Sequence, residues 1–402
     1  MCIRDSIRRA LRASSAGLAL AGAAAAQDSV NVGIILGFTG PLESITPAMG
    51  AGAELAFAEA SESGNLPGGM TLNVVRGDST CIDAAAATTT AENLITGENV
   101  AAIMGADCSG VTTAIANNVA IPNGVVMISP SATSPALSTI DDDGYFFRVA
   151  PSDARQGEII GDILNERGLD NFAITYTNND YGKGLADAIA AAIESRGGSV
   201  AINAAHEDGK GDYSAEVAAL QASGAEHLIV AGYVDQGGVG IVQGSIDTGA
   251  FESFIFPDGM YGQSLLVAVG DEINDKVIGT LPASEGEGAD MFKAIADAAG
   301  IDSTSSFVPE SYDAAALIAL SIAAAGSADR TAIRDKVLEV ANAPGEPILP
   351  GELARGLELA AAGEDIDYMG ATGVELIGPG EAAGSYRVYE IEDLSEKVIE
   401  YR

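Results

Sequence analysis

The chain has 402 residues, of which 47% are apolar, and this composition is typical of a folded globular protein with room for two domains. Its 57 acidic and 20 basic residues give a net charge of −37, and such a field repels phosphate backbones and anionic membranes. Composition and charge therefore argue against a disordered chain and against a nucleic-acid-binding protein. The acidic residues are scattered along the chain, which indicates a solubilising surface.

The first 26 residues have the pattern of a secretory signal peptide. Arg8, Arg9 and Arg12 form a basic start, a weakly apolar stretch follows, and Ala24-Ala25-Ala26 is a small-residue cleavage site. No cysteine follows the cleavage point, and no other apolar run is long enough to span a membrane. We therefore expect a soluble periplasmic protein with no lipid anchor and no stable membrane insertion.

Cysteine usage agrees with export. Cys2 lies in the signal, so the remaining chain carries only Cys81 and Cys108, an even pair in an oxidising compartment. We predict a disulfide between them; two buried free thiols are the alternative.

Past the signal, short apolar strands alternate with helices in two successive sets. In the first set, strands are predicted at 30–36, 72–75, 100–104 and 125–128, and helices at 48–63, 84–95 and 111–120. In the second set, helices are predicted at 156–167, 184–195, 215–222 and 238–248, and strands at 172–176, 199–203, 227–231 and 254–256. Helices at 314–325 and 332–341 and strands at 386–391 and 398–401 complete the pattern.

This alternation predicts right-handed βαβ units and parallel sheets, hence an α/β protein with two doubly wound lobes. The segment 146–151 between the two sets is too apolar for a flexible linker, so we expect a multi-strand hinge. The predicted division is 1–26 signal peptide, 27–149 with 281–384 lobe 1, and 150–280 with 385–402 lobe 2. Ligands of such sheets bind outside the carboxyl ends of the strands.

Signatures of catalysis are scarce. The chain has only two histidines, His206 and His227, with no neighbouring ligand set, and it has no P-loop. We therefore predict that the protein is not an enzyme and carries no cofactor or metal.

Two polar, uncharged segments follow predicted strands. Ser109 stands where a helix begins, and a hydroxyl with backbone N–H groups at such a point binds a carboxylate without a cation. Simple helix capping by Ser109 is the alternative. The second segment, 128–135, is rich in hydroxyls, and an ordinary Ser/Pro loop is its alternative.

The chain resembles the periplasmic binding proteins of branched-chain amino-acid transport, the leucine/isoleucine/valine-binding type, over essentially all of 29–402. The resemblance rests on Gly33–Leu36 with Thr39-Gly40-Pro41, Cys81, Gly105–Ser109, Ile128–Thr133, Asp180–Gly184, Gly232-Tyr233 and Pro257-Asp258-Gly259, in the order of the family. It implies the type I periplasmic binding fold.

The resemblance also implies roles for individual residues. Ser109 and Thr133 match positions that hold the ligand α-carboxylate, while the Ser131 carbonyl and the Thr133 hydroxyl meet the α-ammonium. Tyr181 and Tyr233 match aromatic residues that close over the ligand, and Asp258 matches an acidic residue that pairs with the ammonium. Without the resemblance, the tyrosines read as loop packing and Asp258 as a turn residue. Cys81 and Cys108 match a disulfide beside the carboxylate site.

Two departures from the family concern the ligand side chain. Asp258 stands where the family commonly has Glu, and the segment 41–49 has no aromatic residue, although an aromatic often lies near the position of Ile45. The ligand is therefore leucine-like, another amino acid, or an amide or urea relative.

The resemblance implies a monomeric substrate-binding protein that closes around an amino acid and delivers it to the permease subunits of an ABC transporter. A periplasmic ligand-sensing module that regulates a partner protein is the alternative.

Overall fold

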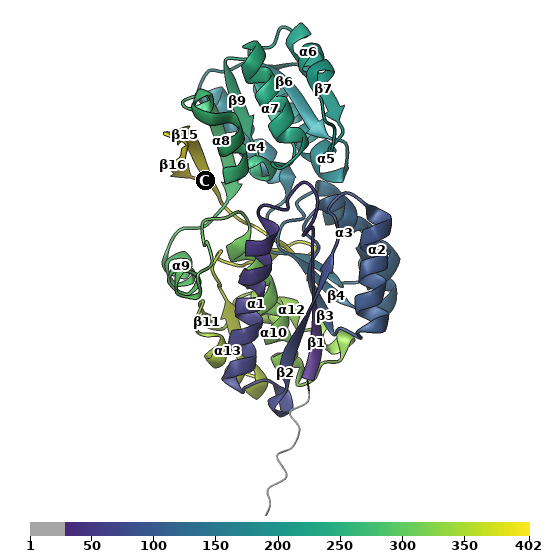
Figure 1. The fold of residues 1–402 in the computed structure, drawn as a ribbon. Helices are drawn as coiled ribbons and strands as arrows, with labels where there is room; N and C mark the ends of the chain where they lie inside the picture. The colour runs from purple at the N-terminus through teal and green to yellow at the C-terminus, as the bar shows by residue number, and fades with distance from the viewer. Residues whose placement is uncertain (1–28) are drawn as a thin grey trace, which may run out of the picture.

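A computed structural model describes residues 29–402, and the predicted signal peptide lies outside the described residues. Two seven-stranded sheets form the centres of two lobes, stacked end to end in Figure 1. In the order of the sheet, the first lobe has β13 (Leu376–Ile377), β14 (Glu381–Ala382), β5 (Phe146–Arg148), β4 (Val126–Ser129), β3 (Ala102–Gly105), β1 (Ser29–Leu36) and β2 (Thr71–Asp78). The second has β16 (Ser395–Tyr401), β15 (Tyr386–Glu392), β10 (Val277–Pro282), β9 (Ser253–Phe256), β8 (His227–Ala231), β6 (Asn171–Thr177) and β7 (Ser199–His206).

Strands β1 to β5 are parallel, as are β6 to β10, so the prediction of two parallel-sheet α/β lobes is confirmed. The central strands are apolar and fully buried, as in β3 and β8, because helices cover both faces of each sheet. In each lobe the strand order reverses beside the first strand, between β1 and β3 and between β6 and β8. Such switch points open a crevice at the carboxyl ends of the strands.

Helices α1, α10 and α13 pack on one side of the first sheet, while α2 and α3 lie on the other (Figure 1). The helices of this lobe are α1 (Thr46–Ser63), α2 (Ala84–Glu92), α3 (Ser109–Ile115), α9 (Glu287–Ala299), α10 (Val308–Ala325), α11 (Arg330–Arg334), α12 (Val337–Ala341) and α13 (Leu353–Ala362). The small strands β11 (Glu346–Ile348) and β12 (Ile366–Tyr368) pair with each other. Among the described helices, α10 alone is long and apolar enough to cross a membrane, and 83% of it is buried in the protein.

The second lobe is covered by α4 (Asp153–Glu166), α5 (Asp180–Ser195), α6 (Ser214–Ala222), α7 (Gly237–Thr248) and α8 (Gln263–Val269). Helix α5 begins four residues before the predicted helix, because the Asn179 side chain accepts a hydrogen bond from the Gly182 N–H (3.0 Å) and caps the helix there. Tyr181 therefore lies in the first turn of a helix rather than in a loop.

The chain passes between the sheets three times, after β5, after β10 and after β14. The last crossing brings β15 and β16 back to the second sheet, where β15 pairs antiparallel with β10. Three crossings bring the carboxyl ends of both sheets toward each other.

Candidate functional site

A cavity lies between the two lobes at the carboxyl ends of their strands. The first lobe lines it with Leu42, Ile45, Met49, Asp107, Cys108, Ser109, Ser131 and Phe307, and the second with Tyr181, Tyr233, Asp258 and Gly259. Five of the six predicted binding residues thus share one cavity. The sixth, Thr133, is buried in the loop after β4 but is not part of the cavity wall. We call this cavity the cleft.

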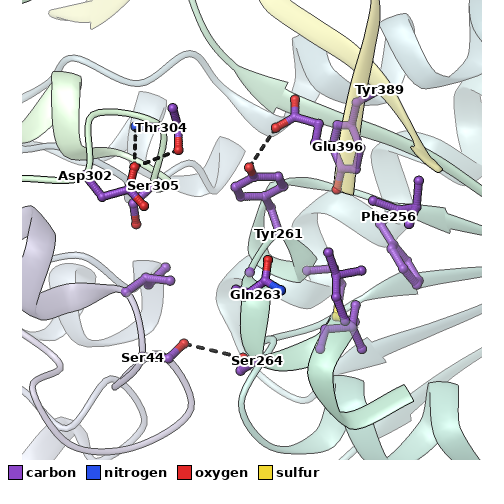
Figure 2. Close-up of a pocket in the computed structure, with 16 residues that line it drawn as sticks. Ser44, Phe256, Tyr261, Gln263, Ser264, Asp302, Thr304, Ser305, Tyr389 and Glu396 are labelled. Carbon is purple, nitrogen blue, oxygen red and sulfur yellow. Dashed lines mark hydrogen bonds between the residues drawn. The ribbon is translucent and has the colours of Figure 1, made fainter. Parts of the chain in front are cut away.

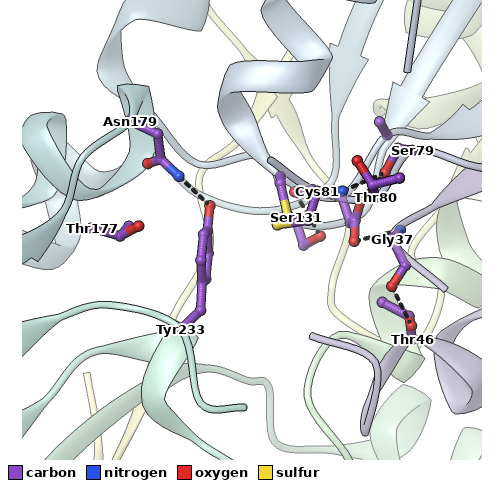
Figure 3. The surroundings of a disulfide bond; sticks show 12 residues. Gly37, Thr46, Ser79, Thr80, Cys81, Ser131, Thr177, Asn179 and Tyr233 are labelled. Carbon is purple, nitrogen blue, oxygen red and sulfur yellow. Dashed lines mark hydrogen bonds between the residues drawn. A yellow bond between two sulfur atoms is a disulfide. The ribbon is translucent and has the colours of Figure 1, made fainter. Parts of the chain in front are cut away.

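The predicted disulfide between Cys81 and Cys108 is confirmed, with a Cα–Cα distance of 5.2 Å. It joins the loop after β2 to the residue before α3, and Cys108 lines the cleft beside Ser109. Figure 3 shows Cys81 and Ser131 of the first lobe opposite Tyr233 and Asn179 of the second. The disulfide therefore fixes the first-lobe wall of the cleft.

Asp107 holds three strand ends of the first lobe together. Its carboxylate accepts hydrogen bonds from the Gly37 N–H (2.9 Å) and the Ser79 hydroxyl (3.2 Å), and burial raises its pKa. The Ser131 hydroxyl in turn donates to the Asp107 carbonyl (3.1 Å). Asp107 thus organises the loops on which the candidate binding residues stand.

The hydroxyl-rich loop after β4 is held from behind by Arg148. This guanidinium, 1% exposed, donates to the carbonyls of Ala132 (3.0 Å) and Ser134 (2.9 Å) and pairs with Glu381 at 2.5 Å. The Ser134 N–H donates to the Ser109 hydroxyl oxygen (3.1 Å), so this loop and the start of α3 form one surface. Sequence reasoning missed Arg148, although a charged residue inside the apolar run 146–150 is itself a sign of a buried, paired cation.

On the second lobe, two tyrosines and Asp258 form a connected group. The rings of Tyr181 and Tyr233 stack with centroids 5.1 Å apart. The Tyr181 hydroxyl donates to Asp258 Oδ1 (3.0 Å) and accepts from the Gly259 N–H (3.0 Å). In the amide orientation that pairs Gln156 with both Asp258 and Thr280, the Gln156 side-chain N–H donates to the same Asp258 oxygen (2.8 Å). Tyr181 and Gln156 therefore hold the Asp258 carboxylate in place.

Asp153, the first residue of α4, is a second carboxylate close to Asp258 although it is not part of the cleft wall, and sequence reasoning missed it. It is fully buried, and neither of its carboxylate oxygens has a hydrogen-bond partner among the described residues. Burial and, secondly, the charge of Asp258 raise the pKa of Asp153 well above its ordinary value. Burial likewise raises the pKa of Asp258. The Thr133 hydroxyl is also buried beside Asp153, and it acts to lower the pKa of that carboxyl against the larger effect of burial.

The remaining wall of the cleft is apolar. Leu42, Ile45 and Met49 come from the loop after β1 and from α1, and Phe307 comes from the residue before α10. The aromatic side chain that is missing from 41–49 is thus supplied by a distant segment. Phe307 has φ +58°, a left-handed conformation that is costly for a bulky residue and is typical of functional positions.

The cleft therefore combines a buried carboxylate with hydroxyl groups and an apolar wall. Asp258, with Asp153 nearby, favours a cationic group, the Ser109 hydroxyl can donate to an anionic group, and the apolar wall suits an aliphatic or aromatic part. Within residues 29–402 no cluster of three or more His, Cys, Asp or Glu side chains suits a metal ion.

Direct hydrogen bonds cross between the lobes outside the cleft. The Ser44 N–H donates to Asp235 Oδ2 (2.8 Å), and the Asp235 N–H donates to the Pro41 carbonyl (3.2 Å). Figure 2 shows the Ser44 side chain directed at Ser264 of the second lobe, with the two hydroxyl oxygens 3.5 Å apart. The Ser134 hydroxyl also donates to the Asp180 carbonyl (3.0 Å). The structure is a closed arrangement of the lobes.

Comparison with known proteins gives consistent matches. The family model described as "Periplasmic binding protein" matches residues 29–356. A leucine-, isoleucine-, valine-, threonine- and alanine-binding protein of Pseudomonas aeruginosa is 29% identical over 78% of this chain and 84% of its own length. The substrate-binding protein of a chemotactic signal transduction system of Halobacterium salinarum is 27% identical over 90% of this chain and 87% of its own.

Among solved structures, the substrate-binding protein of a branched-chain amino acid transporter from Streptococcus pneumoniae, in complex with isoleucine, superposes with a TM-score of 0.76. It is 22% identical, and the match covers 92% of this chain and 99% of the other. This likeness shows a shared fold.

Proposed function

Because this chain belongs to the periplasmic binding protein family, we propose that it captures an aliphatic amino acid between its lobes and delivers it to the permease of an ABC transporter. The family consists of solute-binding proteins rather than enzymes, in agreement with the sequence-based prediction. The names of the Pseudomonas relative and of the Streptococcus structure, both proteins that bind branched-chain amino acids, support the proposed ligand class.

The observation that carries the proposal is the pair of buried carboxylates, Asp153 and Asp258. Two like charges in a buried site repel each other, and an unpartnered buried carboxylate is costly. An α-ammonium group supplies a positive charge and three donors, which offsets part of this repulsion and gives Asp258 a charged partner. A ligand without an ammonium group leaves this cost in place, and for this reason we favour an amino acid over an amide or urea relative.

The rest of the ligand follows from the opposite wall. We assign the α-carboxylate to the hydroxyls of Ser109 and Thr133, and the ammonium also to the Ser131 carbonyl. The side chain lies against Leu42, Ile45, Met49 and Phe307 and beside the stacked tyrosines. Since these four residues are apolar and buried, a branched aliphatic side chain gains most from them.

Binding then requires both lobes, and the ligand favours the closed arrangement because only there does it touch both walls. We propose hinges near Val149-Ala150 and Thr280-Leu281, with lobe 1 formed by 27–149 and 281–384 and lobe 2 by 150–280 and 385–402. The three crossings of the chain between the two sheets support this division. One chain supplies both walls of the cleft, in keeping with a monomer. A signal peptide at 1–26 would deliver the protein to the periplasm as a soluble protein.

A second candidate function is ligand sensing for a partner protein. The observation that favours it is the similarity, over 90% of this chain, to the Halobacterium substrate-binding protein of a chemotactic signal transduction system. Both functions need the same closed complex and differ in the partner that reads it. Disruption of the cognate permease distinguishes them, because it abolishes uptake and leaves a taxis response intact.

The direct test is calorimetry of the purified protein with leucine, isoleucine, valine, alanine and urea, paired with solution scattering. We expect saturable binding of the branched amino acids and a smaller radius of gyration in the complex. The Asp258→Asn variant should bind leucine at least about 100-fold more weakly, because one buried carboxylate partner of the ammonium is lost. Unchanged leucine binding in that variant, or tighter binding of urea than of leucine, would rule out the proposal.

A further inference from the structure

A second cavity lies beside the crossing that follows β10, apart from the cleft. Its walls come from the crossing segment 281–286, from α9, from the start of α10 and from Arg387 on β15. Phe307 lines both this cavity and the cleft. We call it the hinge cavity. The amino-acid site makes no use of its polar groups.

Glu310 is the polar group buried most deeply in the wall of the hinge cavity. It is the third residue of α10 and only 3% exposed. Apart from its own backbone N–H, no donor within residues 29–402 forms a hydrogen bond to its carboxyl group. A buried carboxyl group without a partner is expensive, and such a group in a native protein calls for a ligand, an ion or water.

The two basic side chains on the wall already have acidic partners elsewhere. Lys293 pairs with Asp297 at 2.5 Å on the outer face of α9. Arg387 pairs with Glu396 at 2.9 Å and lies over the Tyr261 ring. Figure 2 shows the Tyr261 hydroxyl directed at the same Glu396 carboxylate. Neither cation hydrogen-bonds to Glu310 within the described residues, although the charge of Arg387 acts to lower its pKa against the larger effect of burial.

Further acidic groups around the hinge cavity add negative charge near Glu310. Glu285 and Asp290 are exposed at its rim, and neither forms an ion pair within the described part of the chain. Asp313, one turn further along α10, adds negative charge near Glu310, although its own carboxylate accepts hydrogen bonds from Tyr368 and Thr372. The polar groups left in the wall, such as the Tyr401 side chain, carry no positive charge. The hinge cavity thus has more acidic than basic side chains, and its buried carboxyl group has no direct cationic partner among the described residues.

We propose that the hinge cavity is a binding site for a small aliphatic ammonium ion that pairs with Glu310. The ammonium group supplies three donors and one charge to a carboxyl group that has neither. The alkyl part lies against the apolar wall formed by Leu281, Phe292 and Phe307, and the acidic rim attracts the cation from solution. Nothing in this inference depends on which ligand fills the cleft.

The buried carboxyl group gives this site a characteristic pH dependence. Burial raises the pKa of Glu310 to about 8, so at neutral pH the empty site holds a proton. Pairing with an ammonium ion requires the carboxylate, and each binding event then releases one proton. The affinity should therefore rise about tenfold per pH unit below the pKa of Glu310 and level off above it.

The test uses the full chain and propylammonium chloride as the probe. Titrations followed by NMR at the Ala371 and Thr372 amides, which line the hinge cavity, are run at pH 6, 7 and 8 in an Asp258→Asn background that disables the cleft. We expect saturable shifts, an affinity that rises about tenfold from pH 6 to 7, and loss of binding in Glu310→Gln. Glu62→Gln, an exposed change on α1, should bind like the parent.

Three outcomes would overturn the proposal: no saturable shift in the parent protein, an affinity independent of pH, or equal affinity in the Glu310→Gln variant. The pH series is measured on the parent protein, so it remains decisive if Glu310→Gln folds poorly. Failure here leaves the proposed amino-acid site untouched, because that site is tested by leucine binding and Asp258→Asn.

Discussion

Asp235 connects the lobes but does not line the cleft. Its substitution therefore measures how much direct contact between the lobes contributes to the free energy of closure. Its carboxylate accepts hydrogen bonds from the Ser44 N–H of the first lobe (2.8 Å) and from the Ser264 hydroxyl of its own lobe (2.7 Å). Only the first of these breaks when the lobes open. The substitution Asp235→Ala removes it and keeps the backbone hydrogen bond to Pro41.

A hydrogen bond to a charged group contributes roughly 1.5–3 kcal/mol, but this one lies at the surface, where water competes, and we take about 1 kcal/mol. If the empty protein is mainly open, that whole amount is lost from the apparent binding free energy, which means about fivefold weaker binding. The factor should be the same for leucine and valine, because Asp235 contacts neither. Calorimetry with both ligands measures it.

Ser44→Ala is the matched control. It removes only a hydroxyl 3.5 Å from that of Ser264 and keeps the N–H that Asp235 accepts, so its affinity should stay near that of the parent protein. An Asp235→Ala protein with parental affinity would refute the reasoning. So would a loss that differs clearly between leucine and valine, since it would place Asp235 in the binding site.

Three further predictions concern the scaffold. Replacing Cys81 and Cys108 together by Ser should lower the unfolding free energy in urea by about 3–4 kcal/mol, because the disulfide spans 27 residues; an unchanged midpoint would contradict this. Gly105→Ala should cost more than about 4 kcal/mol, since a Cβ there lies 2.1 Å from the Ile35 carbonyl oxygen at φ +124°; a folded variant of parental stability would disprove it. Burial lowers the pKa of His206 from 6.5 to about 4. Between these two pH values, only the unfolded chain takes up a proton at this side chain. Stability should then fall with decreasing pH by up to about 1.4 kcal/mol per unit more steeply than in His206→Gln, and equal slopes would exclude this role.

The fold could be predicted from the sequence because the alternation of apolar strands and helices is repeated along the chain. Apolar runs such as 30–36 and 227–231 are short, continuous and separated by helices, which is the pattern of strands buried on both faces. Strand β10 was not predicted, because it contains Gly279 and ends at Pro282, and these residues weaken a strand pattern. Its neighbours in the sheet, β9 and β15, identify it only in the structure.

The candidate site could be predicted from the sequence only in part. Ser109 and Ser131 stand in polar segments that follow predicted strands, where ligands of such sheets bind. The roles of Tyr181, Tyr233 and Asp258 came only from the resemblance to the family, because by themselves these residues indicate loop packing and a turn. Asp153 gave no such signal, because a Ser-Asp pair at a helix start reads as ordinary capping.

What distinguishes Asp153 is complete burial without a partner, and burial depends on the packing of both lobes. Phe307 could not be predicted from the sequence for the same reason. It precedes a helix far along the chain, and only the packing of α10 against α1 brings it to Ile45 and Met49.

The measurement that tests the central claim most directly compares leucine with 4-methylpentanoate, the same molecule without its amino group. Asp153 and Asp258 lie buried at the proposed ammonium site, so the acid leaves two carboxylates without a cation and adds a third negative charge beside them. Calorimetry should show leucine bound at least about 100-fold more tightly, a difference of about 3 kcal/mol. Equal affinity for the two molecules would contradict the account, because it would mean that the buried carboxylates do not recognise an ammonium group.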